Sequence, residues 1–178
     1  MQPPDIHHEW TAADGTRVTI RPIRPADREI EHAFVRNLST NSRYLRFLSM
    51  VKELSPQLLD RFIQPDFPRE MALIATIATG DGELEIGVAR YAPGRKEGTV
   101  EFAIVIADEW QGRGLGREML ERLFDVAKQS GVDRIEGIVL ASNRNMLALC
   151  RELDFRVGAL AGDPTLALVS KQLDSACT

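Results

Sequence analysis

One short stretch of the sequence, residues 111–116, combines residue types and spacing that suit it to holding an anion. In order, its residues are Gln111, Gly112, Arg113, Gly114, Leu115 and Gly116. Glycine adopts positive φ without steric cost, so the chain can turn tightly here and bring its backbone amides close to a ligand. A predicted strand precedes the stretch and a predicted helix follows it, and free N–H groups at a helix N-terminus attract anions. The pattern therefore predicts a pyrophosphate site, to which Arg113 or Arg117 adds charge-assisted hydrogen bonds.

Two other phosphate-binding motifs do not fit residues 111–116. A nucleoside-triphosphate loop needs Gly-Lys followed by Ser or Thr, and no such tripeptide occurs. The dinucleotide fingerprint has two residues between its last two glycines, whereas Gly114 and Gly116 are separated by one. A tight turn without a ligand is the remaining alternative. Three alternating glycines that open a well-patterned helix argue against it.

The elements that must position this stretch follow from hydrophobic periodicity and turn residues. Strands are expected at Arg17–Ile23, Met71–Ile77, Leu84–Tyr91, Thr99–Ile106, Arg134–Leu140, Phe155–Val157 and Thr165–Val169. Helices are expected after Pro25, at Ser42–Leu48, after the Ser55 cap, at Leu115–Ser130 and after Asn143. This order predicts a mixed sheet with helices on both faces, in which residues 99–140 form a parallel strand–helix–strand crossover. We expect residues 1–16 to be a loose segment and residues 17–173 a single domain.

Composition excludes several classes of protein. The net charge of −4 gives no global basic field that would recruit nucleic acid or a membrane surface. Cys150 and Cys177 are too few for a disulfide framework or a four-ligand zinc site, so no metal is expected. The N-terminus has no signal-peptide core, and no apolar run approaches the roughly 20 residues of a membrane helix. These features predict a cytoplasmic protein.

The glycine stretch resembles the acetyl-CoA signature of the GNAT acetyltransferase superfamily. That signature is Gln or Arg, two residues, Gly, any residue, then Gly or Ala, and residues 111–116 match every defined position. The order of predicted elements from Arg17 to Lys171 is also similar to this family. The chain resembles the acetyltransferase domain of bacterial protein-lysine acetyltransferases more closely still. This resemblance rests on residues Arg21–Pro25, Ser42–Phe47, Arg69–Leu73, Glu85–Tyr91 and Glu101–Val105.

The resemblance implies the α+β (α/β) GNAT fold, with a mixed, mostly antiparallel central sheet. It also implies acetyl-CoA as co-substrate and direct acetyl transfer to a primary amine, a protein lysine first of all. Two alternatives stay open: a small-molecule amine acetyltransferase on the same fold, and a non-catalytic CoA-binding regulatory domain.

Glu101 is the candidate catalytic base. Amine acylation needs a neutral amine, whereas a lysine-like ammonium has a pKa near ~10.4. A carboxylate can hold the ammonium and accept its proton directly or through water. Glu101 is unusual as a charged residue in an otherwise apolar strand, and the resemblance implies a base there. The alternative is a solvated glutamate on the strand surface.

The resemblance also implies where the pantetheine arm of CoA lies. In GNAT proteins the arm pairs with the strand backbone, here that of Ala103, Ile104, Val105 and Ile106, and an amide of this strand steadies the oxyanion. Asn143 resembles the asparagine that contacts the arm, and an equally good interpretation is a simple helix N-cap; both roles can coexist.

Two positions depart from the common GNAT pattern. Cys150 stands where a tyrosine usually acts as general acid, and a thiol leaving group with a pKa near ~8.5 needs little proton help. We expect Cys150 to be a packing residue rather than a nucleophile. Asp154 replaces a glycine, and aspartate tolerates a left-handed conformation at modest cost.

Overall fold

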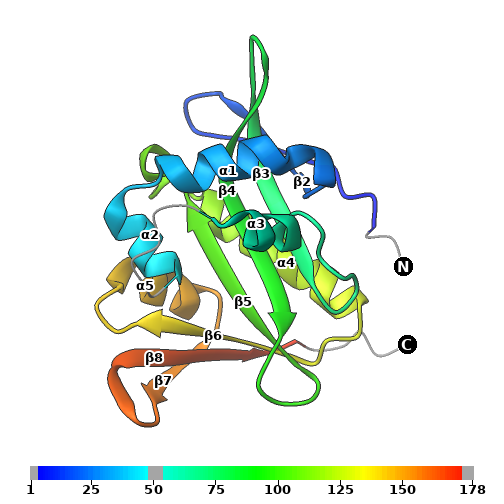
Figure 1. Cartoon of the computed structure of the whole chain (residues 1–178). Coiled ribbons are helices and arrows are strands. Elements are labelled where there is room, and N and C mark those ends of the chain that lie inside the picture. The colour runs from blue at the N-terminus through cyan, green and yellow to red at the C-terminus, as the bar shows by residue number, and fades with distance from the viewer. Residues whose placement is uncertain (1–3, 48–53, 174–178) are drawn as a thin grey trace.

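The computed structural model describes residues 4–47 and 54–173, whose strands form one eight-stranded sheet in the order β1-β2-β3-β4-β5-β6-β8-β7 (Figure 1). The strands are β1 (His8–Thr11), β2 (Arg17–Pro22), β3 (Met71–Thr79), β4 (Gly82–Pro93), β5 (Thr99–Ile106), β6 (Arg134–Leu140), β7 (Arg156–Leu160) and β8 (Asp163–Gln172). Among these strands, β5 and β6 pair in parallel and the other neighbours are antiparallel. The predicted mixed, mostly antiparallel α+β fold is confirmed.

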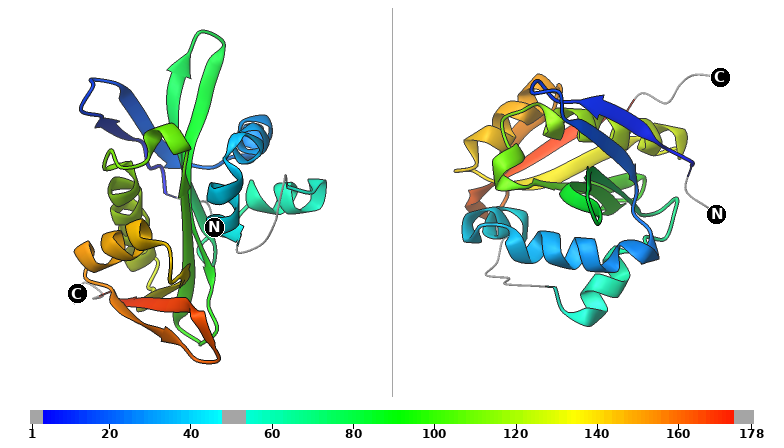
Figure 2. Two further views of the ribbon diagram at one scale, coloured as in Figure 1. Left: turned by 90° about the vertical axis from the view of Figure 1, so that its left-hand side faces the viewer. Right: turned by 90° about the horizontal axis from the view of Figure 1, so that it is seen from above.

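Helices cover both faces of the sheet, as the edge-on view in Figure 2 shows. The helices are α1 (Arg28–Asn37), α2 (Thr40–Phe47), α3 (Pro56–Phe62), α4 (Leu115–Gln129) and α5 (Arg144–Glu152). The first three lie on one face, and α4 and α5 lie on the other. Ser55 caps α3 by accepting a hydrogen bond from the Leu58 amide at 3.2 Å, as the Ser-Pro pair predicts. The helix predicted at Ser42–Leu48 begins two residues earlier, and Leu48 lies outside the described residues.

The expectation of a loose segment at residues 1–16 is wrong for the four residues of β1. His8–Thr11 pairs antiparallel with β2 through a turn in which Gly15 has φ 86°. The Asp14 carboxylate accepts a hydrogen bond from the Thr16 amide at 2.9 Å and stabilises that turn. Polar composition suggested a loose chain, but edge strands are often polar because one face meets solvent.

Strand alternation supplies two hydrophobic cores, one under each layer of helices. The larger core joins α4 and α5 to the sheet through residues such as Phe102, Leu120 and Leu123. The smaller core lies beneath α1 and α3 and includes Phe34, Leu59, Ile74, Val88 and Val105. Neighbouring residues of β5 thus face opposite layers, which determines the layer that each site residue meets.

The β5–α4–β6 unit is the parallel crossover expected for residues 99–140. Only three residue pairs join the two strands in register, from Thr99↔Arg134 to Glu101↔Glu136. Beyond them β5 stays paired with β4, whereas β6 stays paired with β8. The sheet is therefore split between β5 and β6 at their C-terminal ends.

No helix within the described residues is both long enough and apolar enough to span a membrane.

Candidate functional site

The glycine stretch, called the phosphate loop below, joins a short 3₁₀ turn at Asp108–Trp110 to the start of α4. Gly112 has φ 72° and Gly114 has φ 91°, both in the region where glycine is strongly favoured. Gly114 immediately precedes α4 in the left-handed conformation. The first N–H groups of α4 have no carbonyl one turn earlier, so they point out of the helix end toward the loop. This arrangement can hold an anion.

Leu115 and Gly116 contribute to the loop in different ways. The Leu115 side chain is completely buried in the core, so only its backbone can face a ligand. A Cβ on Gly116 would lie 3.5 Å from Leu149 Cδ2, which is ordinary van der Waals contact. The space therefore accepts glycine or alanine at position 116.

Gln111 does not point its side chain away from the protein. Its Nε2 donates to the Ile106 carbonyl at 3.0 Å and to Ser42 Oγ at 3.2 Å. The Ser42 hydroxyl in turn donates to the Asp108 carboxylate at 2.8 Å, and Ser39 donates to it through both its amide and its hydroxyl. Burial alone would raise the pKa of Asp108, but these hydrogen bonds lower it. Gln111 thus braces the loop against β5 and α2.

The two arginines near the loop are paired with carboxylates. Arg113 stacks 4.9 Å from the ring centre of Trp110 and pairs with Asp14 at 3.1 Å. Arg117 pairs with Glu121 at 3.0 Å and lies 3.8 Å from Glu152. The charged side chains of these pairs are partly to largely exposed, and such pairs are worth about 0–1 kcal/mol. An anionic ligand could therefore replace these carboxylates as the partner of each arginine at little cost in free energy.

The split between β5 and β6 exposes one backbone edge of β5 along Ala103–Ile106. The Ala107 amide donates to Ile86 of β4 at 2.8 Å. Successive residues of a strand point their N–H and C=O groups alternately to its two edges. Those of Ile104 and Ile106 therefore face away from β4, toward the split. The Ile106 carbonyl is taken by Gln111. The edge at Ile104 is therefore placed to pair with an extended ligand that enters between the strands.

Glu101 lies where β5 and β6 separate. Its side chain is half-buried and faces the α1–α3 layer, because Phe102 faces α4. Arg46 of α2 interacts electrostatically with it. Burial and repulsion from Arg90 lower the pKa of Arg46 to about 10, whereas the charges of Glu31 and Glu101 raise it. A half-buried carboxylate at the closed end of the split can hold an ammonium group and take its proton.

A buried group of charged side chains that sequence reasoning missed lies between α1 and β4. Arg90 Nη2 is 3.1 Å from Glu31 Oε1, and the guanidinium lies 4.0 Å from the ring centre of Phe62. Burial and the neighbouring Glu31 raise the pKa of Glu85 well above its usual value. Neither carboxylate oxygen of Glu85 has a hydrogen-bond partner when Glu31 and Glu85 are both ionised. A proton on Glu85 resolves this, because the carboxyl can then donate to Glu31.

Asn143 caps α5, as one of its two interpretations predicts. Its Oδ1 accepts a hydrogen bond from the Met146 amide at 3.2 Å. The side chain is half-buried, so its NH₂ group can still reach a ligand.

Cys150 is completely buried in the larger core. Burial raises the pKa of its thiol to about 11, so the thiol is neutral near pH 7. This environment supports a packing role over a nucleophilic one. Cys177 lies outside the described residues.

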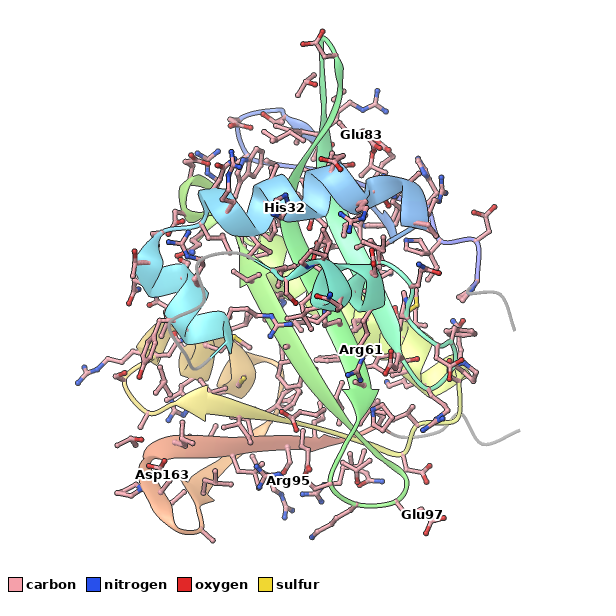
Figure 3. All side chains as sticks on the ribbon, in the orientation of Figure 1. His32, Arg61, Glu83, Arg95, Glu97 and Asp163 are labelled. Carbon is pink, nitrogen blue, oxygen red and sulfur yellow. The ribbon has the colours of Figure 1, made fainter. Side chains whose placement is uncertain are left out.

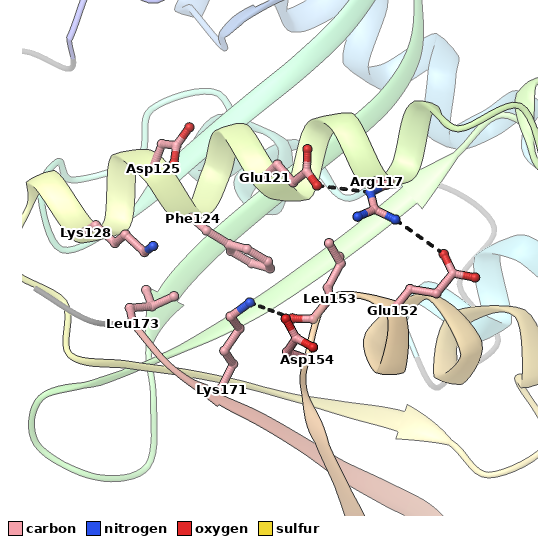
Figure 4. A pocket seen from close by; sticks show the side chains of 10 residues that line it. All are labelled: Arg117, Glu121, Phe124, Asp125, Lys128, Glu152, Leu153, Asp154, Lys171 and Leu173. Carbon is pink, nitrogen blue, oxygen red and sulfur yellow. Dashed lines mark hydrogen bonds and ion pairs between the residues drawn. The ribbon is translucent and has the colours of Figure 1, made fainter.

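A surface hollow between α4, α5 and β8 is separate from Glu101, because it lies on the opposite face of the sheet (Figure 4). Acidic and basic side chains alternate around it, and Lys171 Nζ donates to the Leu153 carbonyl at 2.6 Å. Among the described residues that line this hollow, only Arg117 is also a predicted cofactor-binding residue. Residues 4–47 and 54–173 bring no three potential metal-ligating side chains together.

Comparison with known proteins gives one consistent family. Residues 17–156 match the family described as acetyltransferase (GNAT) domain. The chain is 43% identical to an acetyltransferase of Pseudomonas aeruginosa over 143 residues, which are 80% of this chain and 76% of that protein. It is 28% identical to the acetyltransferase Pat of Mycolicibacterium smegmatis over 87% of this chain, which spans only 45% of that protein.

Among solved structures, the GNAT domain of S. lividans PAT superposes with a TM-score of 0.84 at 26% identity. The superposition covers 94% of this chain and 97% of that one.

Proposed function

The chain belongs to the GNAT acetyltransferase family, and on that premise we propose that it transfers the acetyl group of acetyl-CoA directly to a protein lysine. Membership of the family implies acetyl-CoA as co-substrate. The lysine acceptor, the direct mechanism and the roles of individual residues are our proposals.

The observation that carries the mechanism is the split between β5 and β6, with the phosphate loop at its open end and Glu101 at its closed end. The loop amides and the N-terminus of α4 suit the pyrophosphate of CoA. The free edge of β5 suits the amides of the pantetheine arm, as in strand addition. A CoA held in this way would point its thioester toward Glu101. Asn143, at the start of α5, is within the same proposed binding surface.

In the proposed reaction the lysine ammonium first binds beside Glu101 and loses a proton to it, directly or through water. The neutral amine attacks the thioester carbonyl, forming the C–N bond. A backbone amide on the free edge of β5, that of Ile104 by the alternation above, donates to the developing oxyanion. The C–S bond then breaks, and the amine's second proton passes to the CoA thiolate or to solvent. Such a thiolate needs little help to leave, since a thiol pKa is near ~8.5.

The test is thiol release from acetyl-CoA with lysine peptides and free small amines, in wild type and Glu101→Gln. Gln keeps the size of the side chain but can neither attract an ammonium by charge nor accept its proton. We expect kcat/KM to fall by roughly 10²–10⁴-fold with acetyl-CoA affinity nearly intact. Higher pH should partly rescue the variant, because more of the acceptor is then neutral.

Glu97→Gln is the matched control, because Glu97 is exposed in the β4–β5 loop and, unlike Glu101, is not part of a paired strand (Figure 3). Equal pH–rate profiles and rates for wild type and Glu101→Gln would exclude Glu101 as the base. Turnover of free amines without peptides would favour a small-molecule acetyltransferase. Absence of turnover with every acceptor would favour a binding domain.

A further inference from the structure

A row of four side-chain positions crosses the sheet at the closed end of the split. In register, Glu101 of β5 pairs with Glu136 of β6, Glu136 with Ser170 of β8, and Ser170 with Arg156 of β7. Adjacent strands are about 4.8 Å apart, so the two glutamates start from neighbouring backbone positions. Glu101 therefore has a second carboxylate beside it.

Both carboxylates face the same side of the sheet. A Cβ on Gly137 would lie 2.8 Å from the Phe102 ring, which places positions 137 and 102 on the α4 side. Because side chains alternate along each strand, Glu136 and Glu101 both face the α1–α3 side. Over β6 and β8, however, no helix of residues 4–47 and 54–173 covers this face (Figure 1). On this face Glu101 is half-buried, and Glu136 directly beside it is largely buried.

The face beyond Glu136 is apolar. Ile138 pairs with Leu168 and Leu140 pairs with Leu166, and all four side chains are half-buried. They form a strip of two cross-strand pairs that runs outward from Glu136. Gly158 of β7 pairs with Leu168, and nothing would touch a Cβ there within 4 Å, so the strip is open on that side.

Glu136 is buried beside charged neighbours. Only 7% of the residue is exposed. Among the described residues, Arg134 Nε lies at a long 3.9 Å from the Glu136 carboxylate, and Arg134 is itself largely exposed. Arg156 at the end of the row is exposed, and Arg46 interacts with Glu101 from α2. Two neighbouring carboxylates repel each other, and a cation between them removes that cost.

We propose that Glu136 is a second acceptor-binding residue, which holds the lysine ammonium beside Glu101 while the apolar strip supports the lysine stem. Same-face positions along a strand are about 7 Å apart, close to the reach of an extended lysine side chain. An ammonium at the Glu101–Glu136 row therefore places its methylene groups over Ile138 and Leu168. Lysine side chains commonly lay their stems on apolar surface in this way. This inference rests on the proposed acetyl transfer to lysine.

The experiment uses the full chain and the lysine peptide that wild type acetylates best. Glu136→Gln should raise KM for that peptide by about 10-fold, the usual effect of one charged hydrogen bond, and leave kcat within about 2-fold. The acetylated product peptide has the same stem and no charge, so its inhibition constant should not change. Leu168→Ala, in contrast, should weaken substrate and product peptides alike, by several fold.

Glu97→Gln again serves as the control that keeps all constants at wild-type values. If Glu136→Gln folds poorly, Glu136→Asp keeps the charge and should retain tighter binding of substrate than of product peptide. An unchanged KM, a loss confined to kcat, or an equal loss for both peptides would overturn the role of Glu136. Failure of wild type with every amine would instead refute the proposed function itself.

Discussion

Gly114→Val tests the assignment of the phosphate loop most directly. Gly114 has φ 91° and stands immediately before α4, where its hydrogen atom leaves room for an anion at the helix end. A valine side chain would occupy that room. Its Cβ would lie 3.8 Å from Trp10 Cζ2, an ordinary contact, so the cost to the protein itself comes from the positive φ and not from a clash. The variant should fold but lose acetyl-CoA.

The expected magnitudes separate folding from binding. A residue other than glycine in the left-handed region costs roughly 1–2 kcal/mol, which lowers Tm by about 2–8 °C for a chain of this size. Acetyl-CoA at ~100 times its Kd adds roughly 2.7 kcal/mol, or about 5–10 °C, to wild type. The ligand-induced shift, rather than the Tm of the free protein, is therefore the informative quantity.

Gly131→Val supplies the matched control at the other end of α4. Gly131 has φ 77°, and nothing would lie within 4 Å of a Cβ there. This substitution should cost similar folding energy and keep the full acetyl-CoA shift. Differential scanning fluorimetry with and without acetyl-CoA measures both variants, and Gly114→Ala offers a milder change. A folded Gly114→Val with a wild-type shift would refute the assignment.

Three further substitutions have expected outcomes. Cys150→Ala should keep most turnover and lose about 1 kcal/mol of stability, because the buried thiol fills core volume; an acetyl group mapped to Cys150 by mass spectrometry during turnover would contradict this. Asp154 has φ 62°, so Asp154→Gly should raise the free energy of unfolding by about 0.5–1 kcal/mol, seen in denaturant titration. The pKa of Glu85 is raised in the folded state. Its contribution to the free energy of unfolding is therefore complete below the unfolded pKa and is lost as pH rises toward the folded pKa. Glu85→Gln should therefore gain Tm relative to wild type as pH rises above about 4.3, the ordinary glutamate pKa, and parallel curves of Tm against pH would exclude the raised pKa.

Features that depend on neighbours along the chain were predictable from the sequence. The alternation of glycines at residues 111–116 allows positive φ, and Gly112 and Gly114 have it, whereas Gly116 does not. Apolar and β-branched runs between turn residues located β5, β6 and the other central strands to within a few residues. The cap at Asn143 is one of the two roles expected of that residue, and the positive φ of Asp154 fits the glycine that the family resemblance implies at its position. Each of these depends on backbone preferences within a single turn or strand.

The side-chain partners of the site were decided by tertiary structure. Glu85 and Glu101 give a similar sequence signal, a glutamate beside apolar residues of a strand. The fold buries Glu85 against Glu31 and leaves Glu101 half-buried where the sheet splits. Gln111 belongs to the signature, yet its side chain turns inward to Ser42, 69 residues earlier.

The neighbour of Glu101 shows why such features escape a reading of the sequence. Glu136 lies beside Glu101 because β5 and β6 pair in one register for only three residues before they separate. A shift of that register by one residue would turn Glu136 to the opposite face of the sheet. The sequence determines the chemistry that each strand can present, because alternation and glycine conformation are local properties. Which side chains meet across the sheet depends on pairing between distant segments, and only the folded chain decides it.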